Sequence, residues 1–235
     1  MDALTRLAER PGEAALLLDV DGVLAPIVPR PEDARVPPET QAELRRLTDR
    51  YALVACVSGR AGDDARHVVG LPELVYVGNH GLELEEESPL WGRRLLHFLG
   101  DVDWPDLEDK GLTASLHYRT ASDEAAAERE LEQIADRARK AGFTARFGRK
   151  VLEILPPLHA NKGTAVRRLL VDRGLERALY AGDDTTDLDA FRALEAFELH
   201  VRVAVTSPEG PPELREQADV VVDGPRGFLE LLREL

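Results

Sequence analysis

The sequence predicts an α/β protein, in which a parallel sheet with helices on both faces is interrupted by a smaller inserted α+β cap domain. Short apolar runs alternate with amphipathic helical segments in the first 80 residues, which is typical of a parallel sheet. The same alternation returns after residue 158, whereas residues 101–157 combine several strand patterns with one long helical pattern. We therefore expect a core domain of residues 1–100 and 158–235 and a cap of residues 101–157.

The composition limits the classes of function. The 235 residues include 43% hydrophobic residues, enough for a sizeable core, and carry a formal net charge of −14. Nucleic acid and anionic membrane surfaces attract basic proteins, so we expect neither as a partner. No apolar run approaches the roughly 18 residues of a membrane span, and the N-terminus lacks a signal-peptide pattern. We expect a cytoplasmic, monomeric enzyme that acts on a small molecule.

The first apolar run, residues 16–18, ends in the acidic turn Asp19-Val20-Asp21-Gly22. This pattern predicts a short buried strand with two carboxylates at its carboxyl end, which is where ligands bind in open α/β sheets. Two carboxylates this close repel each other unless they share a proton or a cation. We therefore predict a site for Mg²⁺ and a phosphoryl group at this turn.

The following elements extend the sheet. Residues 25–31 contain three prolines and are expected to form a loop over the site. Pro37 and Pro38 begin a predicted helix with an apolar face, and the runs at 52–57 and 74–77 predict two strands. The first of these strands ends in Ser58-Gly59-Arg60, whose hydroxyl and amide suit a phosphate oxygen, although an ordinary turn has the same composition.

The pattern changes at residue 82. Residues 82–86 alternate as a half-exposed strand, for which residues 93–98 are the expected hairpin partner. Residues 101–110 are polar and are expected to link the core to the cap. The cap is predicted to contain strands at 112–119, 144–147 and 151–155. Its helix, residues 123–141, is predicted to have Ser122 as N-cap and an Asp136–Lys140 ion pair.

The core resumes at Asn161, which is expected to cap a helix reaching residue 174. Lys162 then lies at a helix N-terminus, where phosphate is attracted, although a solvated surface lysine is the alternative. A strand at 178–181 ends in Gly182-Asp183-Asp184-Thr185-Thr186-Asp187. Three acids at a strand end indicate a cation, with a helix-capping acidic loop as the alternative. Strands at 201–205 and 219–222 and a helix at 227–235 complete the predicted sheet.

Taken together, these motifs resemble those of the haloacid dehalogenase (HAD) superfamily phosphatases, whose core is Rossmann-like. The resemblance rests on Asp19-Val20-Asp21-Gly22, Ser58, Lys162 and Gly182-Asp183-Asp184, in this order. Further stretches are similar to the trehalose-6-phosphate phosphatase family over nearly the whole chain, cap included. These stretches are Gly78-Asn79-His80-Gly81, Glu108-Asp109-Lys110-Gly111, Leu116-His117-Tyr118-Arg119 and Leu152-Glu153-Ile154.

The resemblance implies a role for each matched residue of the core. Asp19 is the expected nucleophile, Asp21 the expected acid and base, and Ser58 and Lys162 the expected phosphate-binding residues. Mg²⁺ is expected on Asp19, Asp183 and the backbone carbonyl of Asp21. Asp184 and Asp187 are expected to orient water around the metal.

The resemblance also implies the substrate. Hydrolysis of trehalose 6-phosphate to trehalose and phosphate, through an aspartyl-phosphate, is the implied reaction and the last step of trehalose biosynthesis. The implied substrate-binding residues are Arg60, Glu108, Lys110, His117, Arg119 and Glu153. Two alternatives stay open. One is a related phosphatase acting on sucrose phosphate or a glycosyl-glycerate phosphate, and the other is a non-catalytic module that binds a sugar phosphate.

Overall fold

The computed structural model describes residues 3–148, 150–208 and 210–235. Its residues group into two compact units, one made of the chain up to residue 81 together with residues 160–235, and one made of residues 82–159. The sequence predicted the cap boundaries at residues 101 and 157. In the structure, residues 82–100 group with residues 101–159 in the second unit.

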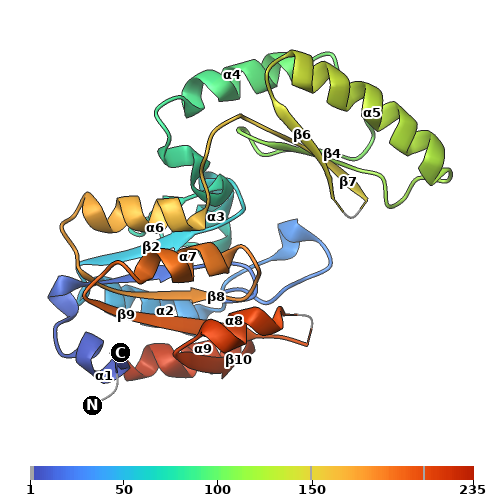
Figure 1. Cartoon of the computed structure of the whole chain (residues 1–235). Helices are drawn as coiled ribbons and strands as arrows, with labels where there is room; N and C mark the ends of the chain where they lie inside the picture. The colour runs from blue at the N-terminus through green and yellow to red at the C-terminus, as the bar shows by residue number, and fades with distance from the viewer. Residues whose placement is uncertain (1–2, 149, 209) are drawn as a thin grey trace. The chain divides into compact units, whose positions relative to one another are not determined.

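The first unit contains a six-stranded sheet in which neighbouring strands run parallel, in the order β10-β9-β8-β1-β2-β3 (Figure 1). All six strands coincide, within a few residues, with apolar runs that predicted strands. They are β1 (Ala14–Leu18), β2 (Leu53–Val57), β3 (Val75–Val77), β8 (Arg177–Gly182), β9 (Leu199–Thr206) and β10 (Val220–Asp223).

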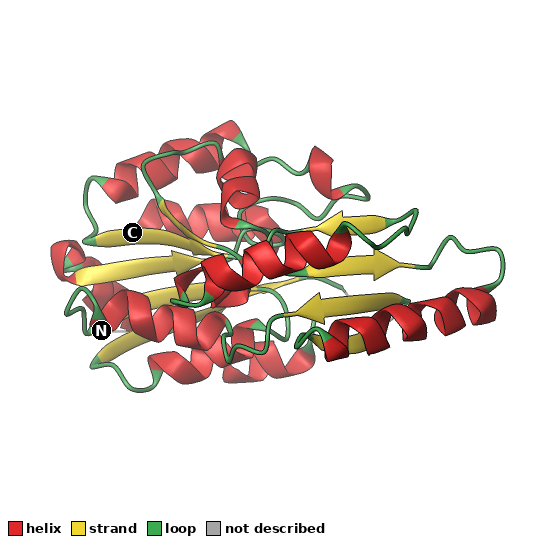
Figure 2. Ribbon diagram, turned by 90° about the horizontal axis from the view of Figure 1, so that it is seen from above, coloured by secondary structure: helices red, strands yellow, loops and turns green. Residues whose placement is uncertain are grey.

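Helices cover both faces of this sheet. On one face, Leu44 of α2 and Phe228 of α9 pack in a common core with Leu18 of β1. On the other face, α6 and α7 lie side by side, and Tyr180 of β8 meets Phe191 of α7 edge-on (Figures 1 and 2). The helices are α1 (Ala3–Ala8), α2 (Pro38–Thr48), α3 (Gly62–Val69), α6 (Lys162–Val171), α7 (Asp187–Leu194), α8 (Pro212–Gln217) and α9 (Gly224–Glu234), with 3₁₀ turns η1 (Pro11–Glu13) and η2 (Pro31–Asp33).

The central strand β1 is the point from which the sheet grows in both directions. The chain continues from β1 to β2 and β3 on one side, and later forms β8, β9 and β10 on the other. Leu18 of β1 is paired in register with Cys56 of β2 and Ala181 of β8, so the three strands end at the same level. Open α/β sheets bind ligands at such a switch point, beyond the carboxyl ends of the strands.

The second unit contains an antiparallel sheet in the order β4-β5-β7-β6. Side chains alternate across it, so Leu116 and Leu152 pack in an apolar core with Leu131 of α5, while Ser115 and Glu153 belong to the opposite face. The elements are the strands β4 (Leu107–Asp109), β5 (Ala114–His117), β6 (Thr144–Gly148) and β7 (Val151–Leu155) and the helices α4 (Ser88–Leu99) and α5 (Glu124–Lys140).

The hairpin predicted before the cap is wrong. Residues 82–84 belong to a 3₁₀ segment, η3 (Asn79–Leu84), and residues 93–98 lie within α4. A strand would place Trp91, Arg93 and Leu95 on one face. In α4, Trp91 and Leu95 are buried while Arg93 is exposed, which is the pattern of a helix packed against a core.

Three smaller expectations about the cap are also wrong. The N-cap of α5 is Asp123, whose carboxylate accepts a hydrogen bond from the Ala126 backbone N–H at 2.9 Å, and not Ser122. Asp136 pairs with Arg139 at 2.9 Å and not with Lys140. The predicted linker contains the edge strand β4. None of the helices formed by the described residues has the length and apolar character needed to cross a membrane.

Candidate active site

A carboxylate and an ammonium group meet at the carboxyl edge of the parallel sheet. Asp19 directly follows β1, and its backbone N–H donates to the Ala181 carbonyl of β8 at 3.0 Å. Lys162 is the first residue of α6, whose start is fixed by reciprocal hydrogen bonds between Asn161 and Thr164. The Nζ atom of Lys162 lies 2.7 Å from Oδ2 of Asp19. Lys162 is only 2% exposed, so it is not a solvated surface lysine.

Asp187 is the second partner of Lys162 and is fully buried. Its Oδ1 accepts hydrogen bonds from Lys162 Nζ at 2.7 Å and from the Tyr180 hydroxyl at 2.6 Å. Its Oδ2 accepts from the backbone N–H groups of Asp183 and Asp184, both at 2.9 Å. A carboxylate has about four acceptor positions, and here all four are used. Asp187 therefore holds Lys162 and the acidic loop in place.

The acidic loop leads into α7 (Asp187–Leu194), but the helix-capping alternative is not confirmed, because the N-cap residue Thr186 makes no side-chain capping hydrogen bond. The side chain of Asp184 is exposed and accepts from the Thr185 hydroxyl at 3.1 Å. Asp184 therefore contributes its backbone to the buried network. Asp183 is partly buried and its carboxylate lies beside Asp19 and Asp187.

Two glycines make room for these carboxylates. Gly22 has a φ of 76°, and a Cβ atom there would lie 2.0 Å from Oδ2 of Asp183. A Cβ atom on Gly182 would lie 2.3 Å from the carboxylate carbon of Asp187. Any side chain at either position would displace a carboxylate, so both glycines are needed for the arrangement.

Burial and mutual repulsion change the acidities of this group of residues. Burial raises the pKa of Asp19 to about 7, because the ammonium of Lys162 only partly offsets burial and the charge of Asp187. Burial, Asp19 and Asp187 together raise the pKa of Asp183 to about 8. Burial works to lower the pKa of Lys162, but the carboxylates of Asp19 and Asp187 outweigh it and raise this pKa. The site therefore holds more negative charge than Lys162 alone compensates.

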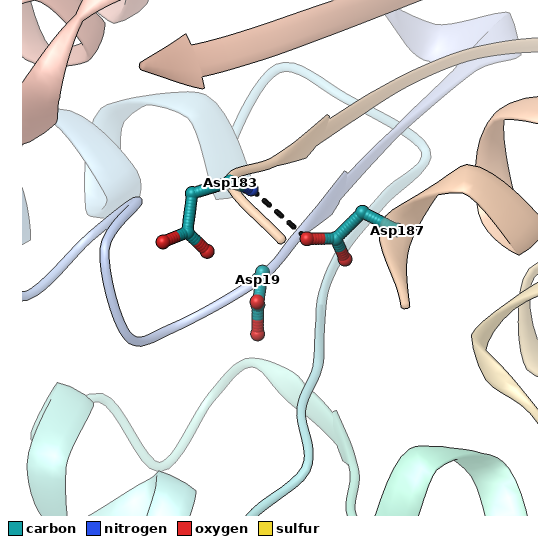
Figure 3. Close-up of side chains that lie close together, drawn as sticks. All are labelled: Asp19, Asp183 and Asp187. Carbon is teal, nitrogen blue, oxygen red and sulfur yellow. Dashed lines mark hydrogen bonds between the residues drawn. The ribbon is translucent and has the colours of Figure 1, made fainter. Parts of the chain in front are cut away.

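The composition of the site fits a hard divalent cation. Asp19, Asp183 and Asp187 each offer a carboxylate oxygen, and these oxygens all lie within 4.8 Å of one another (Figure 3). Oxygen donors and excess negative charge suit Mg²⁺ or a similar cation. Because the acceptor positions of Asp187 are used, Asp19 and Asp183 are the carboxylates best placed to bind it. We call Asp19, Lys162, Asp183 and Asp187 the buried cluster.

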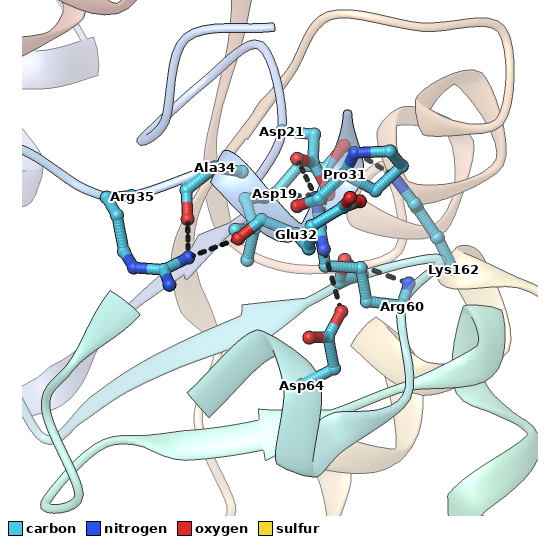
Figure 4. Close-up of polar contacts among 11 residues, drawn as sticks. Asp19, Asp21, Pro31, Glu32, Ala34, Arg35, Arg60, Asp64 and Lys162 are labelled. Carbon is cyan, nitrogen blue, oxygen red and sulfur yellow. Dashed lines mark hydrogen bonds and ion pairs between the residues drawn. The ribbon is translucent and has the colours of Figure 1, made fainter. Parts of the chain in front are cut away.

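Ser58 and Arg60 follow β2 at the same edge. Ser58 is 1% exposed, and its Oγ accepts a hydrogen bond from the Arg60 backbone N–H at 3.2 Å. The guanidinium of Arg60 forms a two-point ion pair with Asp21, with Nε at 2.6 Å from Oδ2 and Nη2 at 2.8 Å from Oδ1 (Figure 4). The structure thus brings Arg60 to a residue of the predicted catalytic set.

Three of the predicted sugar-binding residues of the second unit, Glu108, Lys110 and His117, form one group of contacts. Oε2 of Glu108 lies 3.3 Å from Lys110 Nζ and 3.5 Å from His117 Nε2. Lys110 also donates to the Ser115 hydroxyl at 3.3 Å. Among the described contacts, none joins the exposed Arg119 to this group.

Strand register extends this group across the sheet. Glu108 is paired with Ser115, Ser115 with Glu153, and Glu153 with Arg146, each on a neighbouring strand. Arg146 Nε also lies 2.7 Å from Oε2 of Glu153. We call Glu108, Ser115, Glu153 and Arg146 the polar row. It lies on the face of the sheet opposite the apolar core of the second unit.

A comparison with known protein families shows to which family the chain belongs. The family model described as trehalose-phosphatase matches residues 17–91 and 94–225. The chain belongs to the trehalose-phosphatase family. The matched residues include the buried cluster and the polar row, so the family assignment covers both units.

Relatives and solved structures agree with this family. A rice (Oryza sativa subsp. japonica) protein named "Probable trehalose-phosphate phosphatase 2" is 30% identical over 82% of this chain, and the alignment covers 61% of the rice protein. The chain thus spans about three fifths of the length of that relative. A solved "trehalose-6-phosphate phosphatase related protein" has a TM-score of 0.70 at 22% identity and covers 94% of this chain and 96% of its own.

A solved structure with a different name has a similar fold. A haloacid dehalogenase-like hydrolase from Bacteroides thetaiotaomicron has a TM-score of 0.59 at 13% identity, with 94% of this chain and 98% of that chain covered. At such identities the likeness shows the fold alone. The chain therefore has the HAD-like architecture that its motifs predicted.

Some residues of the site, among them Tyr180, Asp64 and Arg146, were not predicted from the sequence. Tyr180 lies within an apolar strand, and no polar motif marks it as a site residue. Asp64 pairs with Arg60 at 2.7 Å, and its spacing of four residues from Arg60 was the available clue. Arg146 alternates with apolar residues in β6, and only the register of β6 with β7 places it next to Glu153.

Proposed function

We propose that this protein is a Mg²⁺-dependent phosphatase that hydrolyses trehalose 6-phosphate to trehalose and inorganic phosphate. The observation that carries this proposal is the buried cluster at the carboxyl ends of β1 and β8, in a chain of the trehalose-phosphatase family. A carboxylate held 2.7 Å from a buried lysine is suited to attack a phosphoryl group that the same lysine attracts.

The first step transfers the phosphoryl group to Asp19. A carboxylate oxygen of Asp19 forms a bond to phosphorus while the bond from phosphorus to the sugar oxygen breaks. Asp21 gives its proton to that sugar oxygen, so trehalose leaves as a neutral alcohol. Forming an aspartyl-phosphate divides one difficult displacement into two easier ones.

The second step releases phosphate. Asp21, now a carboxylate, takes a proton from a water molecule whose oxygen attacks phosphorus. The bond between phosphorus and Asp19 breaks, and both residues return to their starting forms. The same carboxyl group thus acts as acid and then as base.

The remaining residues of the core orient the phosphoryl group and balance its charge. We assign Ser58 and Lys162 to the phosphoryl oxygens, where negative charge develops during transfer. Asp19, Asp183 and the backbone carbonyl of Asp21 are the proposed Mg²⁺ ligands. When bound, Mg²⁺ supplies positive charge that offsets repulsion between the Asp19 carboxylate and the phosphate. Asp187 keeps Lys162 oriented through their 2.7 Å contact.

We assign sugar recognition to the second unit, because the core groups select only a phosphoryl group. Glu108, Lys110, His117 and Glu153 present charged and polar groups of the kind that bind sugar hydroxyls. Arg119 keeps its predicted role in sugar binding as part of this proposal. Their arrangement supports the assignment, since Glu108, His117 and Glu153 lie on the neighbouring strands β4, β5 and β7, on the face of the sheet that carries the polar row.

The test is phosphate release from trehalose 6-phosphate, with glucose 6-phosphate and sucrose 6-phosphate compared in parallel, first with MgCl₂ and then with EDTA. We expect metal-dependent release that strongly favours trehalose 6-phosphate. Faster release from another sugar phosphate would keep the chemistry and reject the substrate. Absence of release from all three would leave a non-catalytic module that binds a sugar phosphate.

A further inference from the structure

The guanidinium of Arg60 is the centre of a hydrogen-bond network that joins three segments of the first unit (Figure 4). Nε and Nη2 donate to the two oxygens of Asp21, at 2.6 and 2.8 Å. Nη1 donates to Oδ2 of Asp64 in α3 at 2.7 Å. Nη2 also donates to the carbonyl of Pro31 at 3.1 Å. Four of the five N–H groups of an arginine are therefore used within the protein.

The backbone of Arg60 is fixed as firmly as its side chain. Its N–H donates to the Ser58 hydroxyl at 3.2 Å, and its carbonyl accepts from the Asn79 N–H at 2.7 Å. The side chain is 12% exposed, whereas the side chain of Asp21 is 38% exposed. A rigid, largely enclosed arginine thus holds a more exposed carboxylate by both oxygens.

This arrangement differs from that of a substrate-binding arginine. A guanidinium that binds a phosphate or a sugar needs unused N–H groups directed at the ligand. Here the fork geometry of the guanidinium is matched to Asp21, and its outer nitrogens are matched to Asp64 and Pro31. Without this partner, the Asp21 side chain would be free to rotate at the end of β1.

We propose that Arg60 is the positioning residue of Asp21, and that it acts on the reaction through Asp21 instead of through the substrate. This inference rests on the proposed function of Asp21 as the acid and base. By holding the carboxyl group in one orientation, Arg60 fixes the distance over which its proton passes to and from the reacting oxygen. Each oxygen of Asp21 keeps a second acceptor position for that exchange.

The kinetic test is a double-mutant cycle of Arg60→Ala and Asp21→Asn, assayed with trehalose 6-phosphate. Misplacement of a reacting group by about 1 Å costs up to about 100-fold in rate, so we expect Arg60→Ala to lower kcat by about 10- to 100-fold. We expect KM to stay within about threefold, because substrate contacts are unchanged. In the Asp21→Asn background, Arg60→Ala should change kcat less than about twofold, since its target is already lost.

Two variants control for charge and for folding. Arg35→Ala removes an arginine whose Nη1 donates, among the described residues, to the carbonyls of Glu32 and Ala34 at 2.8 and 2.5 Å, and it should leave kcat and KM unchanged. Arg60→Lys keeps the charge without the fork geometry, and we expect it to lose activity nearly as far as Arg60→Ala. Thermal unfolding of each variant identifies any that fail to fold.

A structural readout keeps this inference separate from the proposed function. In ¹⁵N-edited NMR spectra of the whole protein, we expect a protected, shifted Nε–H resonance of Arg60 that moves toward the position of a solvated arginine in Asp21→Ala, which removes both acceptor oxygens. A solvated resonance in the wild type would overturn the pairing, even if trehalose 6-phosphate is hydrolysed. A protected resonance without hydrolysis of any phosphate ester would keep the pairing and reject the proposed function.

Two kinetic outcomes would overturn the positioning role. One is an Arg60→Ala variant with raised KM and unchanged kcat, which would return Arg60 to substrate binding. The other is a cycle in which the effects of Arg60→Ala and Asp21→Asn multiply, because independent residues contribute additively to the free energy of activation.

Discussion

The buried cluster of the first unit and the polar row of the second both contain charged residues, but the two differ in burial and in bonding. In the buried cluster, Lys162 contacts Asp19 and Asp187 at 2.7 Å, and all three side chains are at most 8% exposed. In the polar row, Glu153 is 33% and Arg146 is 63% exposed. Glu108 is 47% exposed, and its contacts are 3.3 Å or longer.

The difference in burial determines how much stability is lost when a residue of either group is substituted. Removing one partner of a buried ion pair costs roughly 3–5 kcal/mol, because the other charge stays desolvated. An exposed pair is worth roughly 0–1 kcal/mol. The buried cluster, to which we assign the phosphoryl chemistry, therefore tolerates substitution poorly. The polar row, to which we assign sugar recognition, can be substituted at little cost to stability.

Asp19→Asn is expected to have the largest effect. The amide keeps the shape of the side chain but is not a nucleophile, so phosphate release should fall on the order of 10⁴-fold or more, about 5.5 kcal/mol of activation free energy. The measurement is phosphate release at saturating substrate, with circular dichroism to verify folding. A loss below tenfold would mean that Asp19 is not the nucleophile.

Asp187→Ala tests whether the buried cluster is a single unit. Lys162 and the Tyr180 hydroxyl would lose their shared acceptor in a dry environment, so the free energy of unfolding should fall by roughly 3–5 kcal/mol. Tyr180→Phe is the matched control, because it removes one of the four hydrogen bonds to Asp187 and should cost about 1 kcal/mol. Urea unfolding in EDTA measures both, and similar losses would contradict the assigned role of Asp187.

Metal binding should stabilise the first unit. At Mg²⁺ concentrations about 100 times the dissociation constant, the stabilisation is about 2.7 kcal/mol, which corresponds to a rise in Tm of about 6–10 °C for a chain of this size. In Asp183→Asn, which removes one proposed ligand charge, the rise should be largely lost. An equal rise in both proteins would place the metal elsewhere.

The strand ends of the first unit were predictable because each apolar run is short and is followed by a distinct polar motif. Asp19, Ser58 and Asp183 come directly after three strands, and parallel strands bring such positions to one edge. Lys162 was predictable as the first residue of a capped helix. Its burial was not, since burial depends on Asp187, which lies 25 residues further along the chain.

Other features depended on packing that no local pattern encodes. Residues 82–98 alternate well enough to suggest a hairpin, yet the requirement to bury Trp91 and Leu95 against the core of the second unit selects a helix. The family resemblance implied that Arg60 binds substrate. The orientation of its guanidinium toward Asp21, 39 residues earlier, follows only from the alignment of β1 with β2.

Glu153→Ala should have the smallest effect of this series, and it tests the polar row directly. Losing one charge-assisted hydrogen bond to a sugar hydroxyl should raise KM for trehalose 6-phosphate about tenfold, or about 1.4 kcal/mol. An aryl phosphate has no such hydroxyl, so its KM should not change.

Arg146→Ala is the matched control. Since Arg146 only orients Glu153 from an exposed position, we expect a rise in KM of no more than about threefold. Equal losses on both substrates would instead mean that Glu153 acts through the stability of the second unit, and the contrast between a fixed core and an exchangeable row would then fail.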